Sequence, residues 1–241
     1  NPGRVIVLGE FGGLGLPVEN HLWNPNMRNW GYRTYTSVPE LIKEYGKLMH
    51  NLHPLRHRGL SAAVYTQTTD VEGEVNGLIT YDRKMIKIDP ELLRIMHAPL
   101  YTSEVKTVKN LVADSEVKDN VLQFTKTKPG ADWQTNTVAN SFGTNNGPVD
   151  VKKSESVWAV NSFNLTDIPD GISLKILAFG SVKVYLNGKL VLDKRIIGKR
   201  HYEHFNISEF GSYLKKGKNQ IAVEAVDFEQ AAQLDFGLYS Y

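Results

Sequence analysis

Residues 5–15 read VIVLGEFGGLG, an unbroken apolar run that ends in a carboxylate and a cluster of glycines. Aliphatic residues without alternation are typical of a strand buried on both faces, as in a parallel sheet. We expect such a strand over residues 4–8. Glu10 then stands at the carboxyl end of the strand. In barrels of alternating strands and helices, these ends carry the catalytic groups, and glycines leave room for a substrate. The alternative for Glu10 is a helix-capping or salt-bridged acid.

Outward from this stretch, the pattern alternates between helix and strand. Ser37 and Glu40 form a capping box ahead of an amphipathic helix that we expect to end near Pro54. A second apolar strand is expected over residues 60–67, and a short helix over residues 89–99. This order favours parallel βα units. Two such units are only a quarter of an eightfold barrel, which needs about 250 residues, so they cannot close one alone.

The second half of the chain changes character, because from about Tyr101 no segment keeps a helical period for long. Asn187 and Gly188 form a strong hairpin signal, since both central residues of a type I′ turn need positive φ. Seven short strands separated by turns predict a β-sandwich or jelly roll. We expect these strands over residues 157–165, 173–179, 182–186, 190–194, 202–207, 220–226 and 233–239.

The composition restricts the classes of partner. The chain has 241 residues, 41% of them hydrophobic and 22% charged, which suits two ordinary globular domains. The net charge of +2, with scattered Lys and Arg, gives no argument for nucleic acid. No apolar stretch reaches the ~18 residues of a membrane helix. The absence of cysteine excludes disulfides and thiolate metal sites, and residues 1–7 show no basic start of a signal peptide.

The glycines of residues 9–15 also invite comparison with a dinucleotide-binding loop. That motif needs G-x-G-x-x-G leading directly into a helix whose N-terminus holds the pyrophosphate. Here Val18 stands where the third glycine belongs, and Pro17 with a long Asn-rich loop replaces the helix. Glu10 would also repel phosphate, so we do not expect a nucleotide to bind.

Residues 9–19, GEFGGLGLPVE, closely resemble the seventh-strand motif of family 2 glycoside hydrolases, especially the bacterial β-galactosidase-like members. In that family the Glu of this motif is the nucleophile. The resemblance implies that Glu10, as an ionised carboxylate, attacks the anomeric carbon and forms a glycosyl-enzyme intermediate. It implies a retaining exo-β-glycosidase of the β-galactosidase kind, whose chemistry needs no cofactor.

Residues 59–72, GLSAAVYTQTTDVE, look like the eighth strand and its loop in the same family. There an aromatic residue at the strand end forms part of the sugar platform, a role that the resemblance gives to Tyr65, although many relatives carry Trp. Gln67 is a further substrate-binding candidate. The alternative for Tyr65 is a core tyrosine whose hydroxyl is bonded to the backbone.

Trp23 and Trp30 lie in a polar, aromatic loop that follows the Glu10 strand. Such loops often line a sugar site, so both tryptophans are substrate-binding candidates. Equally, they can serve to pin a long loop to the barrel.

A retaining glycosidase also needs a second carboxylate as acid/base, about 5 to 5.5 Å from the nucleophile. In this family it lies in an Asn-Glu motif after the fourth barrel strand, and no Asn-Glu dipeptide occurs here. Asp70, Glu72 and Glu74 are the nearest acids after the next strand, but the family pattern gives them no such role. We therefore expect the isolated chain to be nearly inactive, with the acid/base in a missing N-terminal part of the parent protein.

The second half resembles the accessory domains of the same family, which have a galactose-binding-like jelly-roll fold. Most such domains attached to hydrolases are structural, although some bind sugar at the loops of one sandwich end. Trp133 and Trp158 fit core positions as readily as an exposed platform, so a scaffold is favoured over a lectin. The motifs that carry the resemblance lie at residues 131–133, 141–144, 157–158 and 182–189.

These patterns together predict an α/β part followed by an all-β part. Residues 1–104 are expected to be the C-terminal portion of a (β/α)8 barrel, and residues 105–241 a jelly-roll β-sandwich. The edge of a barrel fragment exposes unpaired strand groups, so we expect a homo-oligomer, or a piece of the chain along that edge. The alternative function is a non-catalytic carbohydrate-binding or scaffolding module.

The histidines do not predict a metal site. A proline interrupts the set His50, His53 and His57, and on a strand His201 and His204 face opposite sides. We expect a carbohydrate as the partner, with neither nucleic acid nor membrane. A periplasmic or extracellular location is an expectation from the resemblance only.

Overall fold

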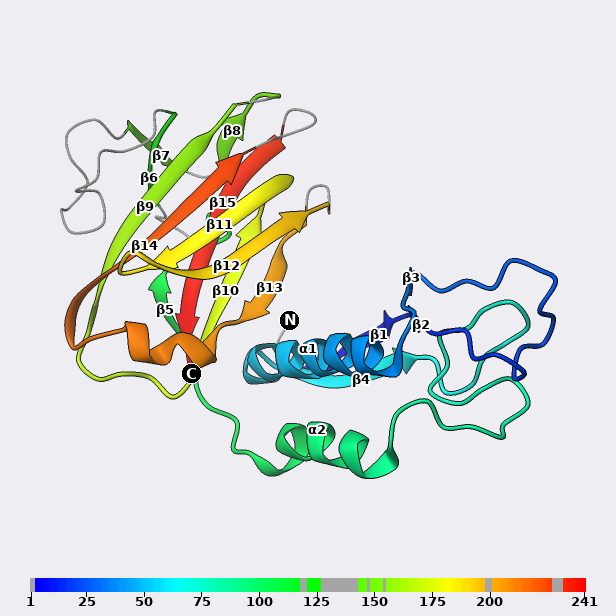
Figure 1. The fold of residues 1–241 in the computed structure, drawn as a ribbon. Coiled ribbons are helices and arrows are strands. Elements are labelled where there is room, and N and C mark those ends of the chain that lie inside the picture. The colour runs from blue at the N-terminus through cyan, green and yellow to red at the C-terminus, as the bar shows by residue number, and fades with distance from the viewer. Residues whose placement is uncertain are drawn as a thin grey trace. The chain divides into compact units, whose positions relative to one another are not determined.

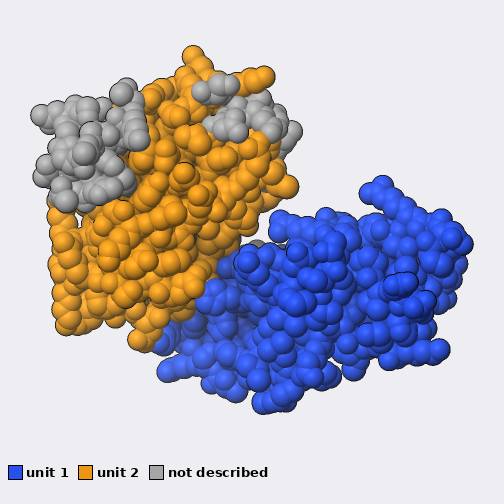
Figure 2. Space-filling model, viewed as in Figure 1, with its two compact units in different colours: residues 1–106 blue, residues 107–241 orange. Residues whose placement is uncertain are grey.

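The computed structural model describes residues 3–117, 121–126, 143–146, 148–153, 155–197, 201–226 and 232–241. The chain divides into two compact units, residues 1–106 (unit 1) and 107–241 (unit 2), which Figure 2 colours separately. Each unit has its own hydrophobic cluster. None of the described helices is long and apolar enough to cross a membrane. Residues 131–133 and 141–142 of the predicted jelly-roll motifs lie outside the described residues.

Unit 1 is built on two parallel strands and two helices (Figure 1). Its main elements follow in the predicted order: β1 (Ile6–Gly12), α1 (Val38–His57), β4 (Leu60–Thr66) and α2 (Pro90–Thr102). β1 and β4 pair in parallel, and α1 forms the crossover between them. In the described part of the chain this sheet has only two strands, so a closed barrel is not shown.

One face of the strand pair is packed and the other is not. Side chains of β1 and β4 join residues of α1 and α2 in the hydrophobic cluster of unit 1. On the strands, however, Val5, Ile6 and Val7 are 72%, 55% and 51% exposed, and Val64 is 53% exposed. The prediction that the first strand is buried on both faces is therefore wrong for this chain. The apolar pattern suits a second covering layer, and no described residue of unit 1 provides it.

The two helices begin as predicted and run past their expected ends. The Ser37 side chain accepts from the Glu40 N–H at 3.4 Å, and the Glu40 carboxylate reaches back to Thr36. α1 continues through Pro54 to His57, and α2 continues through Pro99 to Thr102. A proline near a helix end removes only one backbone hydrogen bond, and the apolar stripes of both helices extend beyond it.

Unit 2 is a sandwich of two antiparallel sheets (Figure 1). The five-stranded sheet has the order β13-β10-β15-β5 with β8 also paired to β15, and the six-stranded sheet has the order β12-β11-β14-β9-β6-β7. The predicted β-sandwich is confirmed. Its strands are β5 (Lys109–Val112), β6 (Val121–Thr125), β7 (Gly143–Asn146), β8 (Val149–Val151), β9 (Val157–Leu165), β10 (Ile172–Leu177), β11 (Gly180–Leu186), β12 (Lys189–Ile196), β13 (Glu203–Asn206), β14 (Gly217–Val226) and β15 (Ala232–Ser240).

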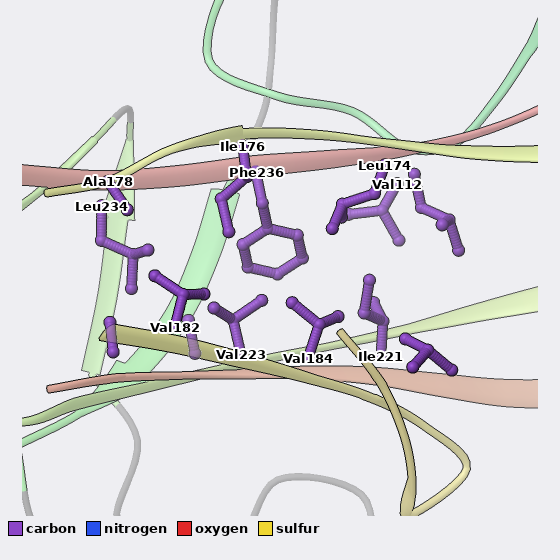
Figure 3. Close-up of a cluster of buried hydrophobic side chains, with 14 of the residues drawn as sticks. Val112, Leu174, Ile176, Ala178, Val182, Val184, Ile221, Val223, Leu234 and Phe236 are labelled. Carbon is purple, nitrogen blue, oxygen red and sulfur yellow. The ribbon is translucent and has the colours of Figure 1, made fainter. Parts of the chain in front are cut away.

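The core of unit 2 lies between the two sheets. Figure 3 shows Ile176 and Phe236 from one sheet facing Val184 and Val223 from the other, and all four are fully buried. Strand alternation places these residues, because every second side chain of each strand points inward. The β11–β12 hairpin has the predicted turn, with φ of 48° at Asn187 and 78° at the following glycine.

A buried polar cluster lies on the face of the five-stranded sheet that points away from this core. Lys175 Nζ donates to Asp114 Oδ1 at 3.0 Å, and Asp114 is fully buried. The same Nζ lies 4.1 Å from the centroid of the Tyr202 ring, whose hydroxyl donates to Asp235. Burial, followed by the Asp235 hydrogen bond, raises the pKa of Tyr202. Each charge therefore has a partner, as a low-dielectric site requires.

Candidate functional site

Glu10 lies near the carboxyl end of β1, and its side chain is exposed. The pairing of β1 with β4 shifts register here, because Leu8 pairs with Ala63 while Phe11 pairs with Tyr65. This extra residue on β1 is a bulge, and it lets Leu8 and Phe11 both pack against the helix cluster. Among the described residues, none is seen to donate to the Glu10 carboxylate. The carboxylate is thus open to solvent on the uncovered side of the strand pair.

Gly12 and Gly13, the two glycines that follow Glu10 and Phe11, each lie against an aromatic ring. Gly12 has a φ of 107°, and a Cβ there would lie 2.4 Å from the Tyr65 ring. Gly13 has a φ of 66°, and a Cβ there would lie 2.3 Å from the Tyr32 ring. Any other residue would be strained at both positions and would displace a ring. The glycines of the motif therefore admit aromatic rings rather than a phosphate.

Tyr65 lies on the helix side of the strands. Its ring meets Phe11 edge to face at 5.6 Å and Tyr45 of α1 at 5.0 Å. Its hydroxyl is buried without a hydrogen bond of good geometry, although the Leu14 backbone lies close enough to favour the ionised form. Burial, followed by the neighbouring Tyr45, raises the pKa of Tyr65. This placement favours the core-tyrosine alternative, and a sugar contact by Tyr65 stays a prediction.

Gln67 begins a long loop that returns to the ends of both strands. Gln67 Nε2 donates to Asn76 Oδ1 at 2.7 Å, and the Gln67 backbone N–H donates to the Asn76 carbonyl at 3.3 Å. Asn76 is fully buried and in turn donates to Glu74 Oε1 at 3.0 Å. With its amide nitrogen engaged, Gln67 keeps its side-chain oxygen as an acceptor.

A buried ion pair holds the same loop. Lys87 Nζ donates to Asp70 Oδ1 at 2.7 Å and to the Val75 carbonyl at 2.9 Å, and the Gly77 N–H donates to the same Asp70 oxygen. Burial raises the pKa of Asp70 and lowers that of Lys87, and their mutual attraction opposes both shifts. The pair therefore holds the loop in place at a cost in desolvation. No sequence pattern indicates this ion pair, since Asp70 and Lys87 are far apart in the chain and match no motif.

Trp30 lies on a loop that is bonded to this one. Its N–H donates to the Gly73 carbonyl at 2.8 Å, and its carbonyl accepts from the Val75 N–H at 2.7 Å. Its indole is 39% exposed and meets the Tyr32 ring edge to face at 5.8 Å. Figure 1 shows residues 16–32 and 67–88 gathered beyond the ends of β1 and β4. The structure thus brings Trp30 and the Gln67 loop to the end of the strand pair that carries Glu10.

Trp23 belongs to a second exposed aromatic pair on these loops. Its indole is 45% exposed and lies 6.3 Å from the ring of Tyr81. Nearby in sequence, His21 Nδ1 lies 2.8 Å from Asp82 Oδ2. Partial burial raises the pKa of Asp82, but hydrogen bonds from Thr80, from His21 and from the backbone outweigh it and bring the pKa to about 2. These contacts join the two loops to each other.

The described residues contain no group of three or more His, Asp or Glu side chains placed to hold a metal ion. His50 and His53 lie on α1 with ring centroids 6.3 Å apart. A cavity of about 160 Å³ is lined by residues of β1, β4, α1 and α2, among them Tyr45, Leu60 and Tyr65. Glu10 is not among the residues that line it.

Neither the models of known protein families nor the curated proteins contain a match to this chain. Among solved structures it is similar to the β-glucuronidase of Ruminococcus gnavus, with 12% identity, a TM-score of 0.40, and coverage of 56% of this chain and 28% of that one. It is also similar to β-glucuronidase 2 of Bacteroides uniformis, with 16% identity, a TM-score of 0.42, and coverage of 56% and 18%. A β-glycosidase of Bacteroides vulgatus is similar at 14% identity, with a TM-score of 0.37 and coverage of 55% and 20%.

These similar structures are glycosidases. The chain spans less than a third of the length of each of them. A likeness at this level carries no statement about the activity of this chain.

Proposed function

We propose that Glu10 is the nucleophile of a retaining β-glycosidase that acts on terminal β-galactosides, and that this chain is one part of that enzyme. One observation supports the proposal above all. An exposed carboxylate stands near the carboxyl end of a parallel strand, and the loops around that end are fixed to one another by backbone hydrogen bonds. In α/β folds this edge of the sheet is where substrates bind.

The chemistry asks for an ionised carboxylate with access to the sugar. A Glu10 oxygen attacks the anomeric carbon, the bond to the leaving oxygen breaks, and a general acid gives that oxygen its proton. The resulting glycosyl ester is hydrolysed when water attacks the same carbon and gives its proton to the conjugate base. Two inversions return the original configuration. The Glu10 side chain is exposed, and it stands on the bulged part of β1.

The general acid of this proposal comes from outside the chain. Asp70 is unsuited, because its side chain is 2% exposed and is bound to Lys87. Glu74 accepts a hydrogen bond from Asn76, which ties it into the loop. Trp23, Trp30, Gln67 and Tyr65 are the proposed substrate-binding residues, with the side-chain oxygen of Gln67 free to accept from a sugar hydroxyl.

A mechanism-based label tests the nucleophile directly. A dinitrophenyl 2-deoxy-2-fluoro-β-glycoside has a leaving group that needs no protonation, so the ester can form even where the acid is weak or distant. The natural polypeptide that contains this chain is treated with the galactoside, glucuronide and mannoside forms of the label. We expect the galactoside form to release one equivalent of dinitrophenolate. The mass of the remaining fluorosugar should be added to the peptide that contains Glu10.

Two variants complete the experiment. Glu10→Gln should abolish both labelling and hydrolysis of nitrophenyl β-galactoside, while Glu19→Gln, which removes another exposed carboxylate in the loop that follows, should leave both intact. The 241-residue chain alone should not hydrolyse the substrate. Labelling by the glucuronide form only would change the proposed substrate from a β-galactoside to a β-glucuronide. Hydrolysis that survives Glu10→Gln would reject Glu10 as the nucleophile. No labelling and no hydrolysis with any form would reject the proposal in favour of a binding or scaffolding module.

A further inference from the structure

The strand alternation leaves the Glu10 side of the strand pair without an aromatic ring from β4. Tyr65 points to the helices, so its neighbour Thr66, opposite Gly12 in the pairing, points to the other side. A threonine is too small to cover the apolar face of a pyranose. An aromatic platform beside Glu10 must therefore come from another element.

Tyr32 is placed to supply that platform. Its ring lies against the backbone of Gly13, at 2.3 Å from the position that a Cβ would take. Gly13 is three residues from Glu10, so their Cα atoms are at most about 11 Å apart, which one bound monosaccharide can bridge. Tyr32 is nevertheless 68% exposed, so its ring meets Gly13 while most of its surface stays open to solvent. Among the described residues, its hydroxyl has no hydrogen-bond partner.

The backbone around Tyr32 is held firmly. The Arg33 N–H donates to the Gly13 carbonyl at 3.3 Å, and β3 (Arg33–Thr34) pairs in parallel with β2 (Leu14–Gly15). On the other flank, a Cβ on Gly31 would lie 2.7 Å from the Gly15 Cα, so these two backbones touch. The backbone on both flanks of the exposed ring is therefore fixed, as a preorganised binding group requires.

We propose that Tyr32, supported by Trp30, is the aromatic platform for the sugar that reacts with Glu10, in the place that the sequence pattern gave to Tyr65. This inference rests on the proposed function. The open ring face takes the C–H face of an uncharged β-pyranose, and the edge-to-face contact with Trp30 fixes the tilt of the ring. The free hydroxyl adds one donor and one acceptor for sugar hydroxyls.

Steady-state kinetics of four variants of the natural polypeptide test this assignment with nitrophenyl β-galactoside. Tyr32→Ala should lower kcat/KM about tenfold or more, mainly through KM, because it removes the stacking surface. Tyr32→Phe should keep most of the kcat/KM of the parent enzyme, because the ring is retained. Tyr101→Ala is the control, because it removes a ring from α2 at a position that is 81% exposed. Tyr65→Phe is the comparison at the other platform candidate, where it removes a buried hydroxyl. Circular dichroism and thermal melting check that each variant folds.

The outcomes separate this inference from the proposed function. If Glu10→Gln abolishes activity while Tyr32→Ala leaves kcat/KM unchanged, the nucleophile stands and the platform is not Tyr32. The inference is equally overturned if Tyr65→Phe, and not Tyr32→Ala, raises KM. If Tyr32→Ala fails to fold, the Tyr32→Leu variant replaces it, since leucine keeps apolar bulk against Gly13 without a flat face. A Tyr32→Leu enzyme with unchanged KM would then contradict the inference.

Discussion

Replacing Lys87 by Met should destabilise the loop of residues 67–88 by about 3–5 kcal/mol. Lys87 and Asp70 are 0% and 2% exposed, and their contact of 2.7 Å is the main charge pairing of the loop. Methionine has a similar volume, so packing is kept while the ammonium is lost. The Asp70 carboxylate would retain only the Gly77 N–H as a donor. An uncompensated charge in a buried site accounts for the size of the effect.

Hydrogen exchange of the loop amides measures this change where it occurs. The N–H groups of Asp70, Leu78 and Ile79 donate within the loop, to carbonyls at distances of 2.9 to 3.1 Å. If the loop opens as a unit, a loss of 3–5 kcal/mol makes these amides exchange about 100- to 5,000-fold faster. Lys84→Met, which alters an exposed lysine of the same loop, should leave their exchange unchanged.

A double variant isolates the buried charge as the cause. Asp70→Asn with Lys87→Met keeps an acceptor for the Gly77 N–H and removes both charges, so exchange should return most of the way to that of the parent chain. Equally fast exchange in the single and double variants would refute the reasoning. So would a Lys87→Met variant that exchanges like the Lys84 control.

Three further predictions concern stability. Gly46→Ala should raise the urea midpoint of unit 1, with a gain of about 0.5–1 kcal/mol, because the glycine lies within α1 and an added Cβ would meet only Met96, at 3.7 Å. Lys175→Met should cost unit 2 about 3–5 kcal/mol, seen as a lower melting temperature, because it leaves the buried Asp114 carboxylate without its cationic partner; an unchanged melting temperature would contradict this. Burial lowers the pKa of His97, so the unfolded chain binds its proton first and stability is lost as the pH falls below about 6.5. His97→Gln should reduce the slope of urea midpoints across this range, while His53 and His57, whose pKa values burial also lowers, keep part of it. The same slope in the variant would exclude His97 as a source.

The sequence predicts which helices and strands form better than it predicts the residues at which they end. Strand β9 matches the expected residues 157–165, and the turn at Asn187 follows from local backbone chemistry. The helix ends were placed at prolines, but Pro54 and Pro99 lie inside the helices, because tertiary packing of the flanking apolar residues outweighs one lost hydrogen bond. Strands β5 to β8 were not predicted, since they are short and lack a clear alternation.

The site was predictable only where chemistry and strand position coincide. Glu10 at the carboxyl end of β1 follows from the apolar run before it. The direction of Tyr65 does not, because it depends on which face of β4 meets the helices. The contact of Tyr32 with Gly13 joins residues that no periodic pattern relates. Contacts of this kind are set by loop geometry, which single-sequence patterns do not encode.

The position of β15 in unit 2 governs the order in which a nascent chain can fold. β15 is the last strand of the unit, yet it pairs with β10, β5 and β8 and so lies at the middle of its sheet. The six-stranded sheet is complete once β14 has been synthesised. The edge of β10 that pairs with β15 stays unpaired until β15 has been synthesised, at a translation rate of roughly 5–20 residues per second. During that interval the apolar face of the finished sheet lacks the part of the opposite sheet that β15 completes.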